Sequence, residues 1–115
     1  MEENIIQNKS FEFALRILKL SQQLEQERQY VIGRQILKSG TSIGANVEEA
    51  IGGQSIQDFF AKITIAYKEA RETKYWLRLL KEGNLLQPNI ADSLLNDSDE
   101  LLRILTAIQK TTKCS

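Results

Sequence analysis

The sequence predicts an all-α protein, an up-down-up-down antiparallel four-helix bundle in a single domain spanning residues 1–115. Apolar residues recur every three or four positions along most of the chain, which is the spacing of one face of an α-helix. Turn-forming or polar residues interrupt this pattern at residues 25–29, at Gly52–Gly53 and between Gly83 and Pro88, so four helices are expected. With 115 residues, 42% of them hydrophobic, the chain can build one core.

The first helix is expected to begin at Ser10, whose hydroxyl can cap a helix N-terminus, and to run for about 18 residues. Residues 1–9 and 112–115 are expected to be loose termini. The residues predicted to face the core are Phe13, Ile17, Leu20 and Leu24.

The second helix is expected from about Tyr30 to Ile51, and Gly52–Gly53 is expected to supply backbone freedom at its end. Its predicted core face contains Ile32, Ile36, Gly40, Ile43, Val47, Ala50 and Ile51, bordered by Gly33 and Gly44. Each glycine inside a helix costs roughly 1 kcal/mol relative to alanine. Three of them therefore indicate that another helix approaches this face closely.

The third helix has a capping signal, because Ser55 is followed three residues later by Asp58. It is expected to run to Lys81 or Glu82 and to be closed by Gly83–Asn84. The predicted core face contains Phe59, Ile63, Ala66, Ala70, Leu77 and Leu80.

The fourth helix is expected to carry Pro88 in its first turn, where the missing N–H of proline is harmless. Its acidic residues precede its basic residues, in agreement with the helix macrodipole. The predicted core face contains Ile90, Leu94, Leu101, Leu105 and Ile108.

Two helices each carry a second stripe that a monomeric bundle does not need. The polar stripe on the second helix contains Gln35, Ser39, Ser42, Asn46 and Glu49. The mixed stripe on the third helix contains, after Asp58 at its start, Ile65, Glu69, Glu72, Trp76 and Leu79. We interpret both as an oligomer interface, in which short polar groups bond across a helix contact and Trp76 is an anchor. The alternatives are an exposed polar face and a tryptophan at the edge of the core.

Most common catalytic and metal sites are excluded, because the chain has no histidine and its single cysteine is Cys114. Zinc sites containing histidine, Ser-His-Asp triads and the Glu-x-x-His ligands of diiron bundles all require histidine. We therefore expect no enzyme, no catalytic residue, no cofactor, no metal and no small-molecule substrate. An all-carboxylate site built from Glu49, Glu69 and Glu72 is the remaining enzymatic alternative.

The charge of the whole chain does not favour nucleic acid, since 15 basic and 15 acidic residues cancel. A local feature does. The third helix carries a basic strip consisting of Tyr67, Arg71, Lys74, Arg78 and Lys81. Such a strip can contact RNA or DNA phosphates without reading sequence. The alternative is an ordinary solvated helix face.

The N-terminal segment MEENIIQNKS has no apolar run of the kind found in secretory signals or membrane spans. A cytoplasmic location without a membrane partner is expected, and the scarcity of cysteine agrees with a reducing compartment.

Residues 39–50, SGTSIGANVEEA, and 66–80, AYKEARETKYWLRLL, resemble a bacterial four-helix-bundle family. This family includes proteins encoded in intervening sequences of large-subunit ribosomal RNA genes. The accessory protein of diversity-generating retroelements is similar more distantly, but it is strongly basic, whereas this chain is neutral. The resemblance covers most of the chain and implies a four-helix bundle, a barrel-like homo-pentamer and a link to ribosomal RNA or ribonucleoprotein.

Two hypotheses follow for the function. The first is a non-enzymatic, homo-oligomeric scaffold or interaction protein associated with ribosomal RNA or ribonucleoprotein. The alternative is an RNA- or DNA-binding module that uses the basic strip.

Overall fold

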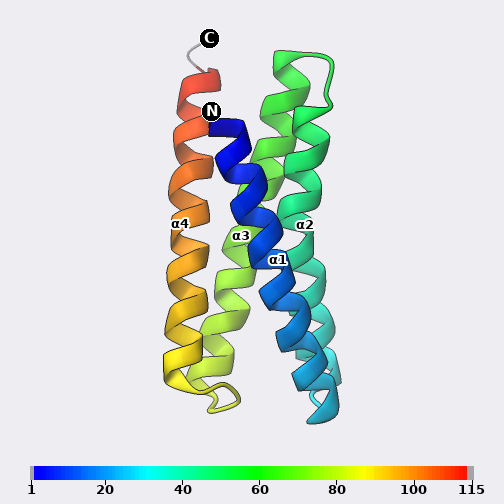
Figure 1. Cartoon of the computed structure of the whole chain (residues 1–115), viewed down its shortest axis with the longest axis vertical. Coiled ribbons are helices and arrows are strands. Elements are labelled where there is room, and N and C mark those ends of the chain that lie inside the picture. The colour runs from blue at the N-terminus through cyan, green and yellow to red at the C-terminus, as the bar shows by residue number, and fades with distance from the viewer. Residues whose placement is uncertain (1, 114–115) are drawn as a thin grey trace.

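The computed structural model describes residues 2–113, which form an all-α, up-down-up-down four-helix bundle (Figure 1). The helices are α1 (Glu2–Gln26), α2 (Tyr30–Ile51), α3 (Ile56–Glu82) and α4 (Pro88–Lys113). Each helix packs on the next, and α1 also packs on α4, so the bundle closes. The bundle measures 46 × 20 × 19 Å, and its first and last helices meet at the end where the chain begins. No helix within the described residues is long and apolar enough to cross a membrane.

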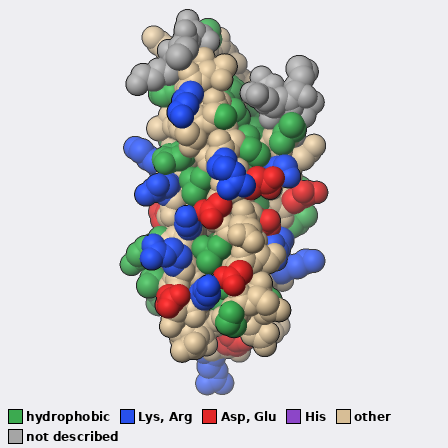
Figure 2. Space-filling model, turned by 90° about the vertical axis from the view of Figure 1, so that its left-hand side faces the viewer, with side chains coloured by type: hydrophobic (Ala, Val, Ile, Leu, Met, Phe, Trp, Pro, Cys, Tyr) green, Lys and Arg blue, Asp and Glu red, His purple; other side chains and the backbone are tan. Residues whose placement is uncertain are grey.

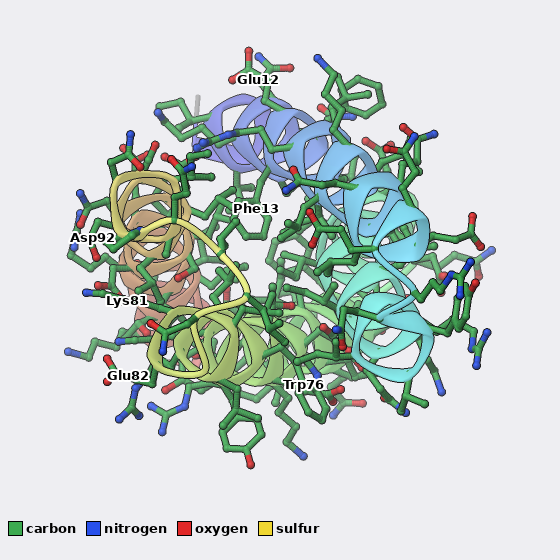
Figure 3. All side chains as sticks on the ribbon, turned by 90° about the horizontal axis from the view of Figure 1, so that it is seen from below. Glu12, Phe13, Trp76, Lys81, Glu82 and Asp92 are labelled. Carbon is green, nitrogen blue, oxygen red and sulfur yellow. The ribbon has the colours of Figure 1, made fainter. Side chains whose placement is uncertain are left out.

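The core lies between the four helices and contains most of the residues predicted for it. All four predicted core residues of α1 are buried, and Figure 3 shows Phe13 pointing inward while its neighbour Glu12 points away. The other predicted residues found buried are Ile36, Gly40, Ile43, Val47, Ala50, Ile63, Ala66, Ala70, Leu77, Leu80, Leu94, Leu101, Leu105 and Ile108. The 3.6-residue period therefore identified the inward face of every helix.

The predicted start of the first helix is wrong, because α1 begins at Glu2 rather than at Ser10. Ser10 is buried in the middle of the helix, and its hydroxyl donates to the carbonyl oxygen of Gln7 at 3.2 Å. Ile6 is buried one turn earlier, so its packing holds residues 2–9 in a helix. At the other end, residues 112 and 113 belong to α4, while 114 and 115 lie outside the described residues.

Two predicted core residues are exposed, namely Ile51 and Ile90. Ile51 is the last residue of α2, where the chain turns away from the bundle. Ile90 lies in the first turn of α4, and the smaller Ala91 takes the inward position. Ile32 and Phe59 are partly buried and pack against the core from its edge.

The start of α3 confirms the capping prediction, because Ser55 Oγ accepts a hydrogen bond from the Asp58 N–H at 3.0 Å. The expectation that Gly52–Gly53 supplies backbone freedom at the end of α2 is wrong, because no described glycine has a positive φ. Gly52 and Gly83 have φ of −82° and −83°, which any residue adopts. The left-handed positions are Arg28 (φ 64°) and Asn84 (φ 61°), which reverse the chain after α1 and α3.

These two turns share one hydrogen-bonding pattern. The N–H after the left-handed residue donates to a carbonyl five residues earlier, Gln29 to Leu24 at 2.8 Å and Leu85 to Leu80 at 2.9 Å. This is the Schellman motif, which satisfies carbonyl groups left free at a helix C-terminus. It ends both helices without using a glycine in the left-handed region.

The close helix approach predicted from the glycines of α2 is found at Gly40. A Cβ atom added there would lie 2.7 Å from Cγ2 of Ile17 on α1. At Gly33 and Gly44 the corresponding distances are 3.4 Å, which are ordinary contacts. Gly40 therefore sets the α1–α2 separation, whereas Gly33 and Gly44 have room for a Cβ atom.

Candidate interaction surfaces

The polar stripe is divided by the fold, because Ser39 lies inside the bundle. Its side chain is fully buried, and the Thr73 hydroxyl of α3 donates to Ser39 Oγ at 2.9 Å. Ser39 is therefore part of the intramolecular α2–α3 contact, and its assignment to an oligomer interface was wrong. Thr73 continues the inward period of Ala66 and Ala70 on α3, a signal that could have predicted its burial.

Ser42 and Asn46, the next members of the polar stripe, have side chains that bond to their own helix in the single chain. Ser42 Oγ donates to the Lys38 carbonyl at 2.6 Å, and Asn46 Nδ2 donates to the Ser42 carbonyl at 2.8 Å. The prediction that these groups bond across a contact between subunits concerns a second chain and stays a prediction. Short side chains reach the carbonyl one turn back on the same helix more easily than a neighbouring helix.

The remaining members of the polar stripe, Gln35 and Glu49, are exposed. Glu49 pairs with Lys62 of α3 at 2.9 Å. The hydrogen bond and the charge of Glu49 raise the pKa of Lys62. This outer edge of the α2–α3 contact therefore carries an ion pair.

The mixed stripe keeps apolar groups at the surface of α3. Ile65 is 39% exposed and Leu79 is 43% exposed, on the same side of the helix. Trp76 lies between them along the helix, on the outer side of the bundle, although part of its ring packs against the core (Figure 3). Its indole N–H donates to Glu72 Oε2 at 3.0 Å. Trp76 thus contributes both to the core edge and to the outer surface.

The surroundings of Glu69 on this surface raise the pKa of its carboxyl group. Burial raises its pKa, the negative charge of Glu72 raises it further, and Lys38 of α2 opposes both effects. The outer α2–α3 face therefore has a partly desolvated acid beside its apolar groups.

The three carboxylates considered for a metal site are engaged differently. Glu49 is paired with Lys62, and Glu72 accepts from Trp76. Across the described part of the chain, no three acidic or cysteine side chains come together as metal ligands would.

The basic strip is partly neutralised by α4. Lys74 pairs with Asp99 at 2.8 Å, and Lys81 pairs with Asp92 at 2.7 Å (Figure 3). The Asp92 hydrogen bond and charge raise the pKa of Lys81. The two aspartates of α4 therefore offset part of the positive charge that Lys74 and Lys81 could present to a phosphate.

The other strip residues remain available at the surface. The Arg71 guanidinium lies over the Tyr67 ring, 6.0 Å from its centroid, and Nη1 donates to Tyr67 Oη at 3.5 Å. Arg78 is exposed, and the described residues give it no acidic partner. Arg71 and Tyr67 also line a groove with Arg103 and Lys110 of α4, which the sequence prediction missed. Arg103 and Lys110 are seven residues apart, which places them two turns apart on one face of α4. This spacing is the sequence signal that could have identified them.

Comparison with known proteins decides the family. The family model described as 23S rRNA-intervening sequence protein matches residues 2–107. The chain belongs to this family. The resemblance carried by residues 39–50 and 66–80 is thereby confirmed.

A solved structure agrees with this membership. It is the crystal structure of a protein of unknown function from the S23 ribosomal protein family of Bacteroides thetaiotaomicron VPI-5482, at 1.70 Å resolution. The two chains are 46% identical, the match covers 96% of this chain and 99% of that chain, and the TM-score is 0.92. A search of the curated proteins finds no match.

Proposed function

We propose that this protein is a non-enzymatic interaction protein that assembles as a homo-oligomeric ring through the outer face of α2 and α3. The observation that carries this proposal is the apolar surface left on α3 after the core is complete. Ile65 and Leu79 are 14 residues apart, so this surface extends about 21 Å along the helix. Trp76 adds an aromatic group of the type enriched at interface hot spots.

The charges on this face favour a second copy of the chain as the partner. The α3 side carries Glu69 and Glu72, while Lys38 lies on the α2 side. Glu69 and Glu72 of one copy can therefore meet Lys38 of the next, while Glu49 of α2 is already paired with Lys62 of α3. A head-to-tail contact of this kind forms a closed ring when its rotation closes. The family resemblance implies five copies.

Light scattering tests this proposal directly. The wild-type protein at micromolar concentration should have several times the 13.1 kDa mass of one chain. Ile65→Glu and Leu79→Glu should lower that mass, because each would bury an unpaired carboxylate at the contact. Ile90→Glu is the matched control, since Ile90 is as exposed as Ile65 and lies on the α1–α4 side of the bundle. A monomeric wild type would refute the proposal, and so would two α3 variants of unchanged mass.

A second function, RNA or DNA binding, is favoured by one observation on the basic strip. Arg71 and Arg78 are exposed and have no acidic partner within the described residues, so they can contact phosphates. The family's connection with the 23S ribosomal RNA gene makes structured RNA the natural probe. Binding should be strong near 50 mM salt and should weaken steeply as salt rises. Absence of RNA and DNA binding at that salt concentration would leave the scaffold function alone.

A further inference from the structure

The α3–α4 side of the bundle contains a shallow groove of about 340 Å³ that the sequence prediction did not identify. Tyr67 and Arg71 line it from α3, and Arg103 and Lys110 line it from α4. Thr106 lies between the two α4 cations, one turn from each. We call this site the basic groove.

The basic groove is positive because the acids of α4 are all elsewhere. Every acidic residue of α4 lies between positions 92 and 100, and the sequence has none after Glu100. Each of these four acids is paired with a cation of α1 or α3. The pairs are Asp92–Lys81, Asp97–Arg16, Asp99–Lys74 and Glu100–Lys9.

The cations of the groove lie beyond this paired region. Among the described residues, none of Arg71, Arg103 and Lys110 has an acidic partner. Figure 2 faces α4 and shows Lys and Arg side chains gathered along its left-hand side. Local positive charge therefore persists on a chain whose net charge is zero.

The arrangement of the cations suits a chain of phosphates better than a single one. Arg103 and Lys110 are seven residues apart, which is about 10 Å along the helix. One phosphate group is too small to reach both cations at this distance, so they would contact different phosphates of one strand. Tyr67 holds the Arg71 guanidinium by a cation–π contact, which reduces the rotamer entropy that Arg71 loses when it binds an anion.

We infer that the basic groove binds the phosphate backbone of a nucleic-acid strand, with Arg71, Arg103 and Lys110 as its phosphate contacts. This inference rests on the second function proposed above, and it relocates the contact from the length of α3 to the groove between α3 and α4. Thr106 supplies a neutral hydroxyl donor between the charged contacts.

Fluorescence anisotropy with a labelled single-stranded RNA and a labelled RNA hairpin, over a series of salt concentrations from about 50 mM, tests the inference. The double variant Arg103→Gln/Lys110→Gln should bind about tenfold more weakly at the lowest salt. Its plot of log affinity against log salt should flatten by about one unit for each lost contact. Arg78→Gln removes a cation of the basic strip outside the groove, and Lys19→Gln is the matched control, because it removes an exposed α1 cation outside both. This control should bind nearly as well as the wild type.

The possible outcomes separate the inference from the function on which it rests. Loss of binding in Arg78→Gln but not in the groove variant would overturn the inference and leave binding by the basic strip intact. Equal loss in both variants would also overturn it, since a general charge effect would explain the data. A wild type that binds neither RNA would overturn the inference and the second function together.

Two further measurements distinguish other sources of phosphate. Anionic phospholipid vesicles that bind in place of RNA, and lose binding in the groove variant, would show a lipid site and refute the inference. Displacement of the RNA by low concentrations of inorganic phosphate would show a single-phosphate site instead. Circular dichroism and light scattering on each variant should match the wild type, so that lost binding reports the groove rather than lost folding or assembly.

Discussion

Replacing Gly40 with alanine should destabilise the bundle, although alanine normally stabilises a helix. The added Cβ would lie 2.7 Å from Cγ2, 2.9 Å from Cγ1 and 3.1 Å from Cβ of Ile17. Rotation of the Ile17 side chain cannot remove all three contacts, because its Cβ does not move and the residue is branched there. The backbones of α1 and α2 must therefore separate.

The size of the effect follows from two opposing terms. Glycine to alanine within a helix gains roughly 1 kcal/mol. Overpacking a well-packed contact costs about 1–3 kcal/mol. The net destabilisation of Gly40→Ala is therefore about 0–2 kcal/mol. Gly44→Ala is the matched control in the same helix, since its Cβ would lie 3.4 Å from Ser10 atoms, and it should gain most of the helix-propensity term. The difference between the two variants isolates the overpacking cost of about 1–3 kcal/mol.

Urea unfolding followed by far-UV circular dichroism measures both free energies of unfolding, at one protein concentration so that the proposed assembly would affect both variants equally. A cavity at position 17 should relieve the clash, so Gly40→Ala should cost less in an Ile17→Ala background than in the wild type. The close-packing explanation is refuted if Gly40→Ala is as stable as Gly44→Ala. Additive effects of the Ile17 and Gly40 substitutions would refute it as well.

Two further predictions concern the α2–α3 contact. Thr73→Val should lower the free energy of unfolding by about 1 kcal/mol, because it removes the hydrogen bond between the buried hydroxyls of Thr73 and Ser39. Adding Ser39→Ala should cost less than the sum of the single changes, and thermal or urea unfolding of the three variants checks this. Glu69→Gln should remove a pH dependence of stability. Because the folded-state pKa of Glu69 is raised, its contribution is fully present below the unfolded glutamate pKa of about 4.3 and is lost as pH rises through the folded value. Unfolding free energies of the wild type and Glu69→Gln should therefore diverge over that interval in favour of the variant, and parallel profiles would contradict the assignment.

Much of the fold was predictable because helix formation and helix ends depend on local sequence. The periods around Ile17, Ile43 and Leu77 identified buried faces correctly, and Ser55 identified the start of α3. The prediction failed where a local signal competed with packing. Ser10 resembles a helix cap, but burial of Ile6 extends the helix through it.

The candidate surfaces were less predictable because a helix pattern does not say what a neighbouring helix contributes. The spacing of Lys74 and Lys81 correctly placed them on one side of α3, yet their charges are offset by aspartates 25 and 11 residues further along the chain. Arg71 has no such partner among the described residues, and α4 instead places two more cations, Arg103 and Lys110, beside it.

The sequence by itself therefore determined the helices and their inward faces, since these depend on periodicity and turn chemistry. It also determined the family, through residues 39–50 and 66–80. Tertiary structure alone decided which surface groups remain free. Ser39 is buried because Thr73 meets it from α3, and the basic groove exists because the antiparallel arrangement pairs the acid-rich first half of α4 with cations of α1 and α3. The second half of α4, which has no acids, is left beside Arg71. Such charge balance depends on distances of a few ångströms between residues far apart in sequence, because Coulomb energy falls with distance through space rather than along the chain.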